Sequence, residues 1–483
     1  MKHTYKLIVA LLLMIVIFAS CKKTIDLKPS HTLDGDLAFN KIEDYEFALT
    51  GAYSRLLSVN YYGSSNGSNA FVTLSDMMSD NLFESAESLG NYQNFSRWTY
   101  TADDANLEAT WLAAYRVIQQ CNLTVRNLDK LSASNPGGVN RVKSQALALR
   151  AFVHFDILRY WGEGTARNSA ARGIPYVSSF DIEQKPARLS VQASYDAIIN
   201  DLHNAKALMQ DLDRSIQSAT STASTARSYI DLITTNAILA RVYNYAGESD
   251  SAIKYASLAI ASRPLASKTN FPLIWQDAST AEVIWSVKFT PLNSGTGDNV
   301  YYAIGNRASY RPSTNLVSLY DQTNDVRFAS YYQVRTRGSG SRLVLSKYMA
   351  KQAQLGRPDG ITDFKVLRTG EMYLIRAEAY ARLGMDQLAL DDLNTLRAAR
   401  INGFTAGAES GPALLTAIET ERRKELVAEG HRWFDLKRTT RVVTRSTNCV
   451  VFCTLEPDAR EWVWPLPQSE ILANPGIEQT AGY

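Results

Sequence analysis

The chain has 483 residues, of which 45% are hydrophobic and 20% charged, with 51 Lys and Arg against 48 Asp and Glu. A chain of this length and apolar content can bury a large core. The near balance of charge argues against a nucleic-acid-binding protein, which needs a basic face to displace counterions.

The first twenty residues have the pattern of a signal peptide. An apolar run from Leu7 to Phe18 follows two lysines, and it is shorter than the roughly 20 residues that span a bilayer core. Ala19-Ser20-Cys21 ends the run with the small residues that a lipoprotein signal peptidase accepts. We therefore predict a lipoprotein signal peptide at 1–20 and a lipid on Cys21. An ordinary cleaved secretory signal with a chance cysteine is the alternative. We expect the mature chain to be soluble and tethered, because no second long apolar stretch follows.

Helical periodicity dominates the remaining chain. A first helix is predicted at 42–57, where apolar residues form one stripe. Further helices are predicted at 107–131, 139–161, 191–210, 230–246, 249–262, 365–383, 386–401 and 412–429.

Two predicted helical pairs share a spacing of small and aromatic residues that helical periodicity alone does not require. Small residues let paired helices approach closely, an aromatic ring fills the gap between them, and a glycine ends the first helix. The first pair carries Leu239, Ala240, Tyr243, Gly247, Ala252, Ala259 and Pro264, and the second carries Ala377, Tyr380, Gly384 and Ala389. The pattern predicts a mainly α fold, a tetratricopeptide-like helical-repeat scaffold of about eight paired helices. This scaffold covers about 40–58, 107–262 and 364–438.

Two long inserts, at about 59–106 and 265–363, interrupt the scaffold. They lack helical period and are rich in Asn, Ser, Gly and aromatic residues, with a β-like stretch at Val283–Val287. Irregular segments of this length are uncommon in a compact protein unless they are functional, so we place ligand binding there. A sugar needs flat aromatic faces and planar polar groups. The candidates are Tyr61, Asn81, Trp98, Trp275, Tyr301, Tyr310 and Arg311. For each aromatic the alternative is a place in the core.

Residues 419–438 carry charges at helical spacing, so that opposite charges lie along one strip before a glycine breaks the run. We interpret this stretch as a structural ion-pair network between a helix and a hinge. Carboxylates beside arginines have lowered pKa values, which do not suit an acid catalyst, and we predict no catalytic residue. The signature residues are Glu421, Arg422, Glu425, Glu429, Gly430, Arg432, Asp435 and Arg438.

With Leu426 and Leu436, these residues read E-R-x-x-E-L-x-x-E-G-x-R-x-x-D-L-x-R without a gap, which resembles the C-terminal signature of the SusD/RagB family. The segments Trp464–Pro467 and Asn474–Ile477, and the final Gly482-Tyr483, resemble the family's closing motif. Gln479-Thr480-Ala481 departs from its usual Gln-Asn-Pro. The resemblance implies eight helices in four pairs and an outer-membrane nutrient-binding lipoprotein that works with a TonB-dependent, SusC-like transporter. The family's ligand residues vary between members, so the signature assigns none here.

The cysteines and histidines do not indicate a metal or a cofactor. Cys449 and Cys453 lie four positions apart and could form a disulfide across a tight loop, which an oxidising compartment permits. A metal site is less favoured, because neither has a histidine nearby. Cys121 is expected to be a buried small hydrophobe. The five histidines are scattered.

We therefore expect one SusD-like domain at 21–483, closed by a C-terminal segment at 439–483. The predicted function is an outer-membrane, surface-exposed lipoprotein that binds oligosaccharides and delivers them to the transporter. The alternatives are peptide capture by the same architecture, a tethered helical-repeat adaptor and, third, an enzyme. Surface exposure is less firmly indicated than acylation, because Lys22 and Lys23 directly follow Cys21.

Overall fold

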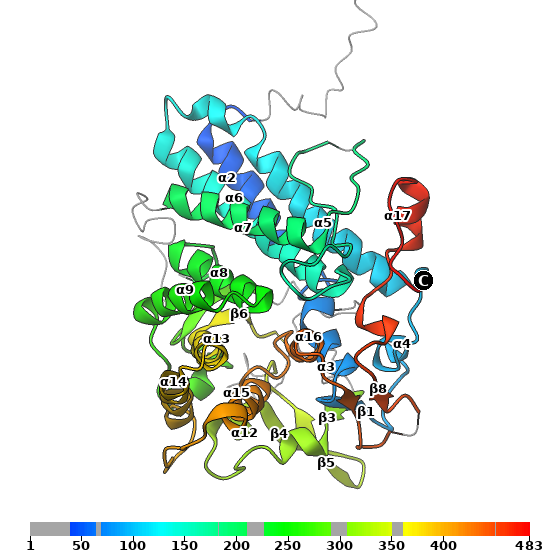
Figure 1. The fold of residues 1–483 in the computed structure, drawn as a ribbon, viewed down its shortest axis with the longest axis vertical. Coiled ribbons are helices and arrows are strands. Elements are labelled where there is room, and N and C mark those ends of the chain that lie inside the picture. The colour runs from blue at the N-terminus through cyan, green and yellow to red at the C-terminus, as the bar shows by residue number, and fades with distance from the viewer. Residues whose placement is uncertain are drawn as a thin grey trace, which may run out of the picture.

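A computed structural model describes residues 39–63, 69–181, 183–209, 227–290, 307–349, 361–449 and 451–483. Its long helices form two groups that lie one above the other in Figure 1. Predicted residues Cys21 and Tyr301 lie outside the described residues. The long helices are α2 (Ile42–Arg55), α5 (Ala105–Val125), α6 (Pro136–Trp161), α7 (Val191–Met209), α8 (Leu232–Ala246), α9 (Ser249–Ser262), α13 (Thr369–Arg382), α14 (Asp386–Ala398) and α15 (Gly411–Glu425).

The upper group consists of α2, α5, α6 and α7, with α6 at its centre (Figure 1). Helix α6 begins where the side chain of Asn135 accepts a hydrogen bond from the amide of Gly138, and it is buried from Gln145 to Trp161. Arg150 of α6 donates two hydrogen bonds to Asp201 of α7, at 2.7 and 2.8 Å. A buried ion pair of this geometry fixes how the two helices pack.

The lower group is made of the α8–α9 and α13–α14 pairs together with α15. Gly247 ends α8 with a φ of 78°, and Gly384 follows α13 with a φ of 71°. A left-handed residue closes a helix at little cost when it is glycine. The two predicted repeat pairs and the predicted mainly α, tetratricopeptide-like scaffold are confirmed.

The strands form four two-stranded antiparallel sheets in the described residues, and two of them join distant parts of the chain. Strand β1 pairs with β3, which connects the two inserts, and β2 pairs with β6, which connects the second insert to the start of α13. The predicted helix at 365–383 is therefore wrong at its start, because β6 occupies 364–368. The strands are β1 (Leu82–Glu84), β2 (Val283–Val287), β3 (Tyr310–Pro312), β4 (Tyr332–Arg337), β5 (Gly340–Leu345), β6 (Phe364–Arg368), β7 (Val443–Thr444) and β8 (Thr454–Leu455).

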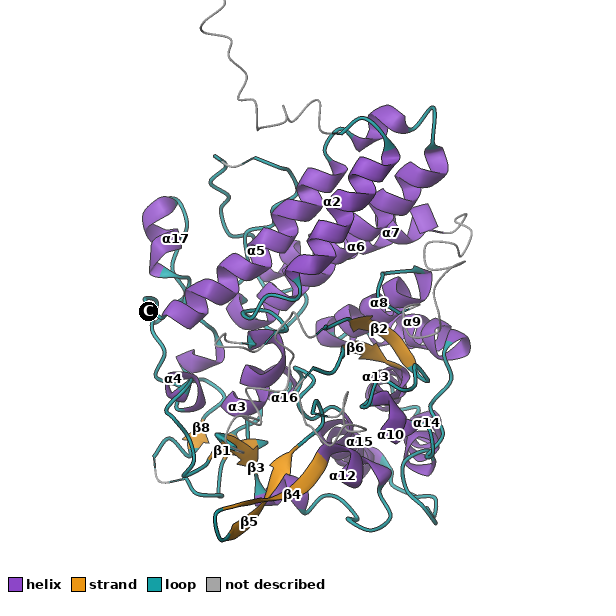
Figure 2. Cartoon of the chain, turned by 180° about the vertical axis from the view of Figure 1, so that it is seen from behind, coloured by secondary structure: helices purple, strands orange, loops and turns teal. Residues whose placement is uncertain are grey.

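The inserts are folded segments with short helices (Figure 2). The first contacts α6 of the upper group, where Phe71 packs against Tyr160, and also α16. The second contacts the lower group, where β2 lies against α8. Their largest aromatic side chains enter the main hydrophobic core. The expectation that the inserts display their rings to solvent is wrong for the described rings, because burying them removes large apolar areas from water. The short helices of the chain are η1 (Ala70–Leu74), α3 (Ser75–Met78), α4 (Gln93–Ser96), η2 (Leu128–Leu131), α10 (Phe271–Ile274), α11 (Thr314–Val317), α12 (Val326–Tyr331), α16 (Arg432–Arg438), η7 (Arg460–Trp462) and α17 (Gln468–Ala473).

Among the helices described, none combines the length and the apolar character needed to cross a membrane.

Candidate ligand-binding cleft

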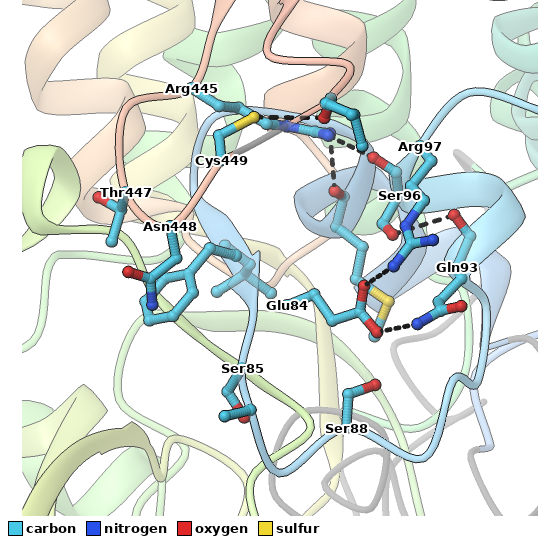
Figure 3. Close-up of a pocket in the computed structure, with 15 residues that line it drawn as sticks. Glu84, Ser85, Ser88, Gln93, Ser96, Arg97, Arg445, Thr447, Asn448 and Cys449 are labelled. Atoms are coloured by element: carbon cyan, nitrogen blue, oxygen red, sulfur yellow. Dashed lines mark hydrogen bonds and ion pairs between the residues drawn. The ribbon is translucent and has the colours of Figure 1, made fainter.

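A cavity lies between the first insert and the C-terminal segment (Figure 3). It has a volume of about 560 Å³, within the range of cavities that hold small ligands. One wall comes from β1, the loop after it and α4, and the other from the loop between β7 and β8. We call this cavity the cleft. It is lined by Met77, Leu82, Phe83, Glu84, Ser85, Ala86, Ser88, Gln93, Ser96, Arg97, Arg445, Thr447, Asn448, Cys449 and Val451.

Arg445 holds the two walls together. Its guanidinium donates hydrogen bonds to the carbonyl oxygens of Ser79 (2.8 Å) and Met77 (3.0 Å), and also to those of Met78 and Ser96. It lies 4.0 Å from the centroid of the Trp98 ring. These hydrogen bonds join the β7–β8 loop to the segment 77–79 and to Ser96, so Arg445 supports the floor of the cleft.

A disulfide bond closes the tip of the β7–β8 hairpin. Cys449 and Cys453 are bonded, with their Cα atoms 5.6 Å apart, so the bridge that the sequence left open is present. Below the disulfide, the amide of Arg445 donates to the carbonyl of Cys453 at 2.8 Å. The bridge therefore constrains the loop that carries Thr447 and Asn448 into the cleft wall.

The opposite wall carries a group of polar side chains around Glu84. Arg97 donates to the carboxylate of Glu84 at 3.0 Å, and Gln93 donates to its other oxygen (Figure 3). Burial would raise the pKa of Glu84, but the hydrogen bonds from Gln93, Ser88 and Arg97 hold it below its usual value. Glu84 is therefore ionised at neutral pH, and it is the single carboxylate among the described lining residues.

Phe83 is the aromatic side chain of the cleft lining in the part of the chain that the structure describes. It is half-buried, and the Arg311 guanidinium lies 5.5 Å from its ring centroid. The arrangement places a flat apolar surface next to an amide, a carboxylate and a guanidinium. Such a combination can bind a ligand that presents both C–H faces and hydroxyl groups.

Four of the predicted aromatic residues do not face this cleft. Tyr61 is fully buried, and its hydroxyl donates to Asp156 at 2.7 Å. Trp98 donates from Nε1 to the carbonyl of Met78 at 2.9 Å, beneath the floor. Trp275 and Tyr310 are each 1% exposed. The expectation that these four rings face solvent is therefore corrected.

The two predicted polar residues support the walls of the cleft. Asn81 is buried, donates to Asp76 at 2.6 Å and accepts from Arg423 at 2.8 Å. Arg311 of β3 lies opposite Phe83 of β1 in the sheet register.

Sequence reasoning missed Phe83, Glu84, Gln93 and Arg97 of the first insert, and Thr447 and Asn448 of the closing segment. Within the first insert, the cluster of amides and charges after Phe83 was a usable signal. No sequence pattern indicated that 445–451 would lie against it.

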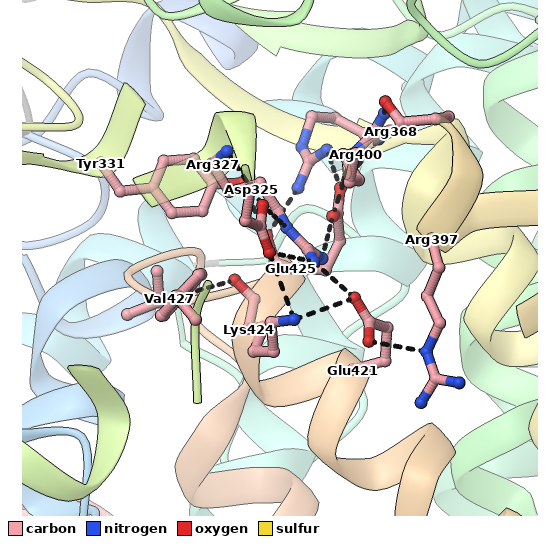
Figure 4. A network of polar contacts seen from close by, with 12 residues as sticks. Asp325, Arg327, Tyr331, Arg368, Arg397, Arg400, Glu421, Lys424, Glu425 and Val427 are labelled. Carbon is pink, nitrogen blue, oxygen red and sulfur yellow. Dashed lines mark hydrogen bonds and ion pairs between the residues drawn. The ribbon is translucent and has the colours of Figure 1, made fainter. Parts of the chain in front are cut away.

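The signature residues form a buried ion-pair network (Figure 4). Glu425 accepts from three arginines, at 3.0 Å from Arg327, 2.8 Å from Arg368 and 3.0 Å from Arg400. Glu429 accepts from Arg368 and from Lys347, each at 2.6 Å. The predicted structural network is present, but these partners come from α12, the segment after β5, the end of β6 and the turn after α14 rather than from the same helical strip.

The remaining signature residues connect the helix to the first insert and to α13. Arg432 binds Asp80 through two hydrogen bonds, at 2.7 and 2.9 Å. Arg422 and Arg438 each donate to Asp435, at 2.8 and 2.9 Å. Asp80 also pairs with Arg423. The network therefore fixes the segment that directly precedes β1.

Gly430 lies in the turn between α15 and α16, with a φ of 80°. A Cβ atom there would lie 2.2 Å from the carbonyl oxygen of Phe71. Only glycine permits this close approach to the first insert.

The described residues contain no group of three or more His, Cys, Asp or Glu side chains that could hold a metal ion. Cys121 is free and buried.

Two family profiles match separate parts of the chain. Residues 39–257 match the family described as "Starch-binding associating with outer membrane", and residues 320–483 match the SusD family. The SusD-like protein P38 of Formosa agariphila is 22% identical, over 98% of this chain and 98% of the relative.

Solved structures share the fold. A SusD superfamily protein from Bacteroides thetaiotaomicron superposes with a TM-score of 0.79 at 23% identity, covering 91% of this chain and 100% of the other. A SusD-like carbohydrate binding protein from Bacteroides vulgatus has a TM-score of 0.74 at 22% identity, covering 91% of this chain and 98% of the other. The two family matches, the signature at 419–438 and the shared fold together establish that this chain belongs to the SusD family.

Proposed function

We propose that the protein binds an oligosaccharide in the cleft and passes it to a TonB-dependent, SusC-like transporter in the outer membrane. The observation that carries the proposal is the presence of Phe83, Glu84, Gln93 and Arg97 in the lining of one cavity. A sugar ring can lie on Phe83 while its hydroxyls bind the planar polar groups. The names of the matched family and of the Bacteroides vulgatus protein support a carbohydrate ligand.

The N-terminal sequence and the description of the matched family support a location at the outer membrane. We propose a single domain at 21–483, released from a signal peptide at 1–20 and held at the outer membrane by a lipid on Cys21, facing outward. The description of the matched family supports outer-membrane association. Labelling with palmitate should require Cys21, and proteinase treatment of intact cells should digest the protein. Protection from proteinase would place it on the periplasmic side.

We propose binding without catalysis. Glycoside hydrolysis uses two carboxyl groups about 5 to 9.5 Å apart, whereas Glu84 is the single carboxylate of the described cleft lining. Its lowered pKa also disfavours a role as a general acid. Incubation with polysaccharide should release no new reducing ends.

Isothermal titration with a panel of oligosaccharides and peptides tests the ligand class. Phe83→Ala should weaken oligosaccharide binding by about tenfold, or about 1.4 kcal/mol, because the stacking surface is lost. Phe47→Ala is the matched control, since Phe47 lies on α2 and is 75% exposed. Binding of peptides alone would favour the peptide-capturing alternative. Binding of neither, with no transporter co-purifying, would favour an adaptor.

A further inference from the structure

Beside the cleft, arginines gather around one carboxylate, that of Glu87. Arg342 donates to it from Nε at 2.6 Å and from NH2 at 2.9 Å. Arg337 NH1 lies 3.9 Å from the same carboxylate, and Arg307 donates to the Glu87 main-chain carbonyl at 3.1 Å. We call Arg307, Arg311, Arg337 and Arg342 the arginine cluster.

The cluster carries more positive charge than Glu87 can balance. Arg311 donates from Nε to the neutral carbonyl of Leu343 at 3.2 Å. Burial lowers the pKa of Arg311, and the nearby charge of Arg342 lowers it further, against the opposite effect of Glu87. Within the part of the chain that the structure describes, Arg307 and Arg311 form no ion pair with a carboxylate. A local excess of positive charge attracts anionic groups.

The cluster adjoins the cleft through β1 and the loop after it. Phe83 and Arg311 are opposite each other in the β1–β3 sheet, and the guanidinium lies beside the ring that lines the cleft. Ser85 and Ser88, on either side of Glu87, also line the cleft and lie at its lower end in Figure 3. A ligand that lies on Phe83 and extends past these serines therefore reaches the cluster.

We propose that the ligand of the cleft is an acidic oligosaccharide, and that Arg311 and Arg337 bind its carboxylate or sulfate groups. This inference rests on the proposed function and adds the charge of the ligand to it. Guanidinium groups bind such planar or tetrahedral oxyanions through paired hydrogen bonds. An acidic protein partner could use the same charge, but continuity with a concave, aromatic-lined cavity favours a sugar chain.

Matched pairs of sugars test the inference. The first pair is a galacturonic acid oligomer and its fully methyl-esterified, neutral counterpart. The second is a sulfated galactan oligosaccharide and its desulfated counterpart, so that the two pairs distinguish carboxylate from sulfate. In calorimetry, at least one acidic sugar should bind about tenfold more tightly than its neutral counterpart at about 0.05 M salt, and the ratio should shrink at about 0.5 M.

Two arginine variants then test whether the arginine cluster causes the preference for acidic sugars. Arg337→Gln should weaken binding of the acidic sugar about three- to tenfold and leave binding of the neutral one unchanged. Arg311→Gln should weaken binding of the acidic sugar by a larger factor than binding of the neutral one, because Arg311 also lies against the Phe83 ring of the cleft wall. Arg441→Gln is the matched control, because Arg441 is exposed and pairs with Glu419 away from the cleft. Arg337 is itself exposed, so its replacement should leave the melting temperature unaltered.

Equal affinity for acidic and neutral sugars would overturn the inference and leave the proposed function standing. Tighter binding of acidic sugars that persists in both arginine variants would overturn the assignment to the cluster. Absence of binding to every sugar would contradict the proposed function and the inference together. Binding of an acidic peptide in place of any sugar would assign the cluster to a protein partner.

Discussion

Among single residues, buried carboxylates with lowered pKa values determine how the stability of this protein changes in acid. Burial would raise the pKa of Glu421, but Arg327, Lys424 and Arg397 hold it at about 2. Arg327 lies 2.6 Å and Arg397 3.1 Å from its carboxylate. The pKa of Glu425 is likewise well below its usual value, because Arg400, Arg368 and Arg327 outweigh its burial.

Because the pKa of Glu421 is lower in the folded than in the unfolded chain, its contribution to stability is present above about pH 4.5 and is lost as the pH falls towards about 2. Glu421→Gln should therefore lower the free energy of unfolding by about 3 kcal/mol at pH 7. The difference from the wild type should shrink as the pH approaches 3. Urea unfolding of both proteins across this range measures it, and a difference that does not depend on pH would contradict the assigned pairing.

Gly430 is a second residue whose replacement should strongly lower the stability of the protein. Gly430→Ala should destabilise the protein by about 3 kcal/mol or more, because the φ of 80° is strained for alanine and its Cβ would meet the Phe71 carbonyl. Gly384→Ala is the matched control, with a φ of 71° and no atom within 4 Å of the added Cβ. It should cost only about 1 kcal/mol. Equal losses in urea unfolding would show that strain alone, and not contact with the first insert, requires glycine at 430.

Among the elements that form the cleft, the β7–β8 hairpin can be altered most directly, by reduction of its disulfide. Its disulfide closes a very short loop, because the two cysteines are only four positions apart in the sequence. A loop of this size contributes about 2 kcal/mol at most in the chain-entropy description. The hairpin should keep its strand pairing and the anchor of Arg445 when the bridge is open, because neither involves the cysteine sulfur atoms.

Reduction of the disulfide should therefore weaken oligosaccharide binding more than it lowers stability. We expect a loss of affinity of about three- to tenfold, because Thr447 and Asn448 are no longer held against the opposite wall. Calorimetry before and after reductant measures the change. The double variant Cys449→Ser and Cys453→Ser is the control and should bind as the reduced protein does, with or without reductant. Unchanged affinity on reduction would place the ligand away from this loop.

The long helices could be predicted from sequence because their signal is local. The predicted helix at 249–262 matches α9, and the one at 191–210 agrees with α7 over the described residues 191–209. The strand β6 could not be separated from the helix that follows, since its apolar residues continue the helical spacing. Its partner β2 is more than 75 positions earlier in the sequence, and that pairing decides its conformation.

At the scale of the whole molecule, the inserts are held by contacts that no local pattern encodes. Tyr61 is buried against Asp156, 95 positions away, and Asp80 binds Arg432, 352 positions away. Aromatic residues in irregular segments therefore looked like binding surfaces when they are core side chains. The signature was predicted as structural, and its role is wider than predicted, because it joins both inserts to the helical scaffold.

The cleft itself is assembled from two segments, 77–97 and 445–451, that lie far apart in the sequence, which explains why its position could not be predicted. The sequence alone indicated ligand binding in both inserts, and it indicated the kinds of side chain that a sugar requires. Phe83 was overlooked in favour of larger rings, and only the fold shows that those rings are covered.

A crystal structure of the protein soaked with the tightest-binding oligosaccharide of the panel tests the central claim most directly. The account predicts a sugar ring against the face of Phe83, with hydroxyl groups near Glu84, Gln93 and Asn448 and an acidic group towards Arg311. A bound oligosaccharide elsewhere on the molecule, with the cleft between the first insert and the β7–β8 hairpin empty, would contradict it.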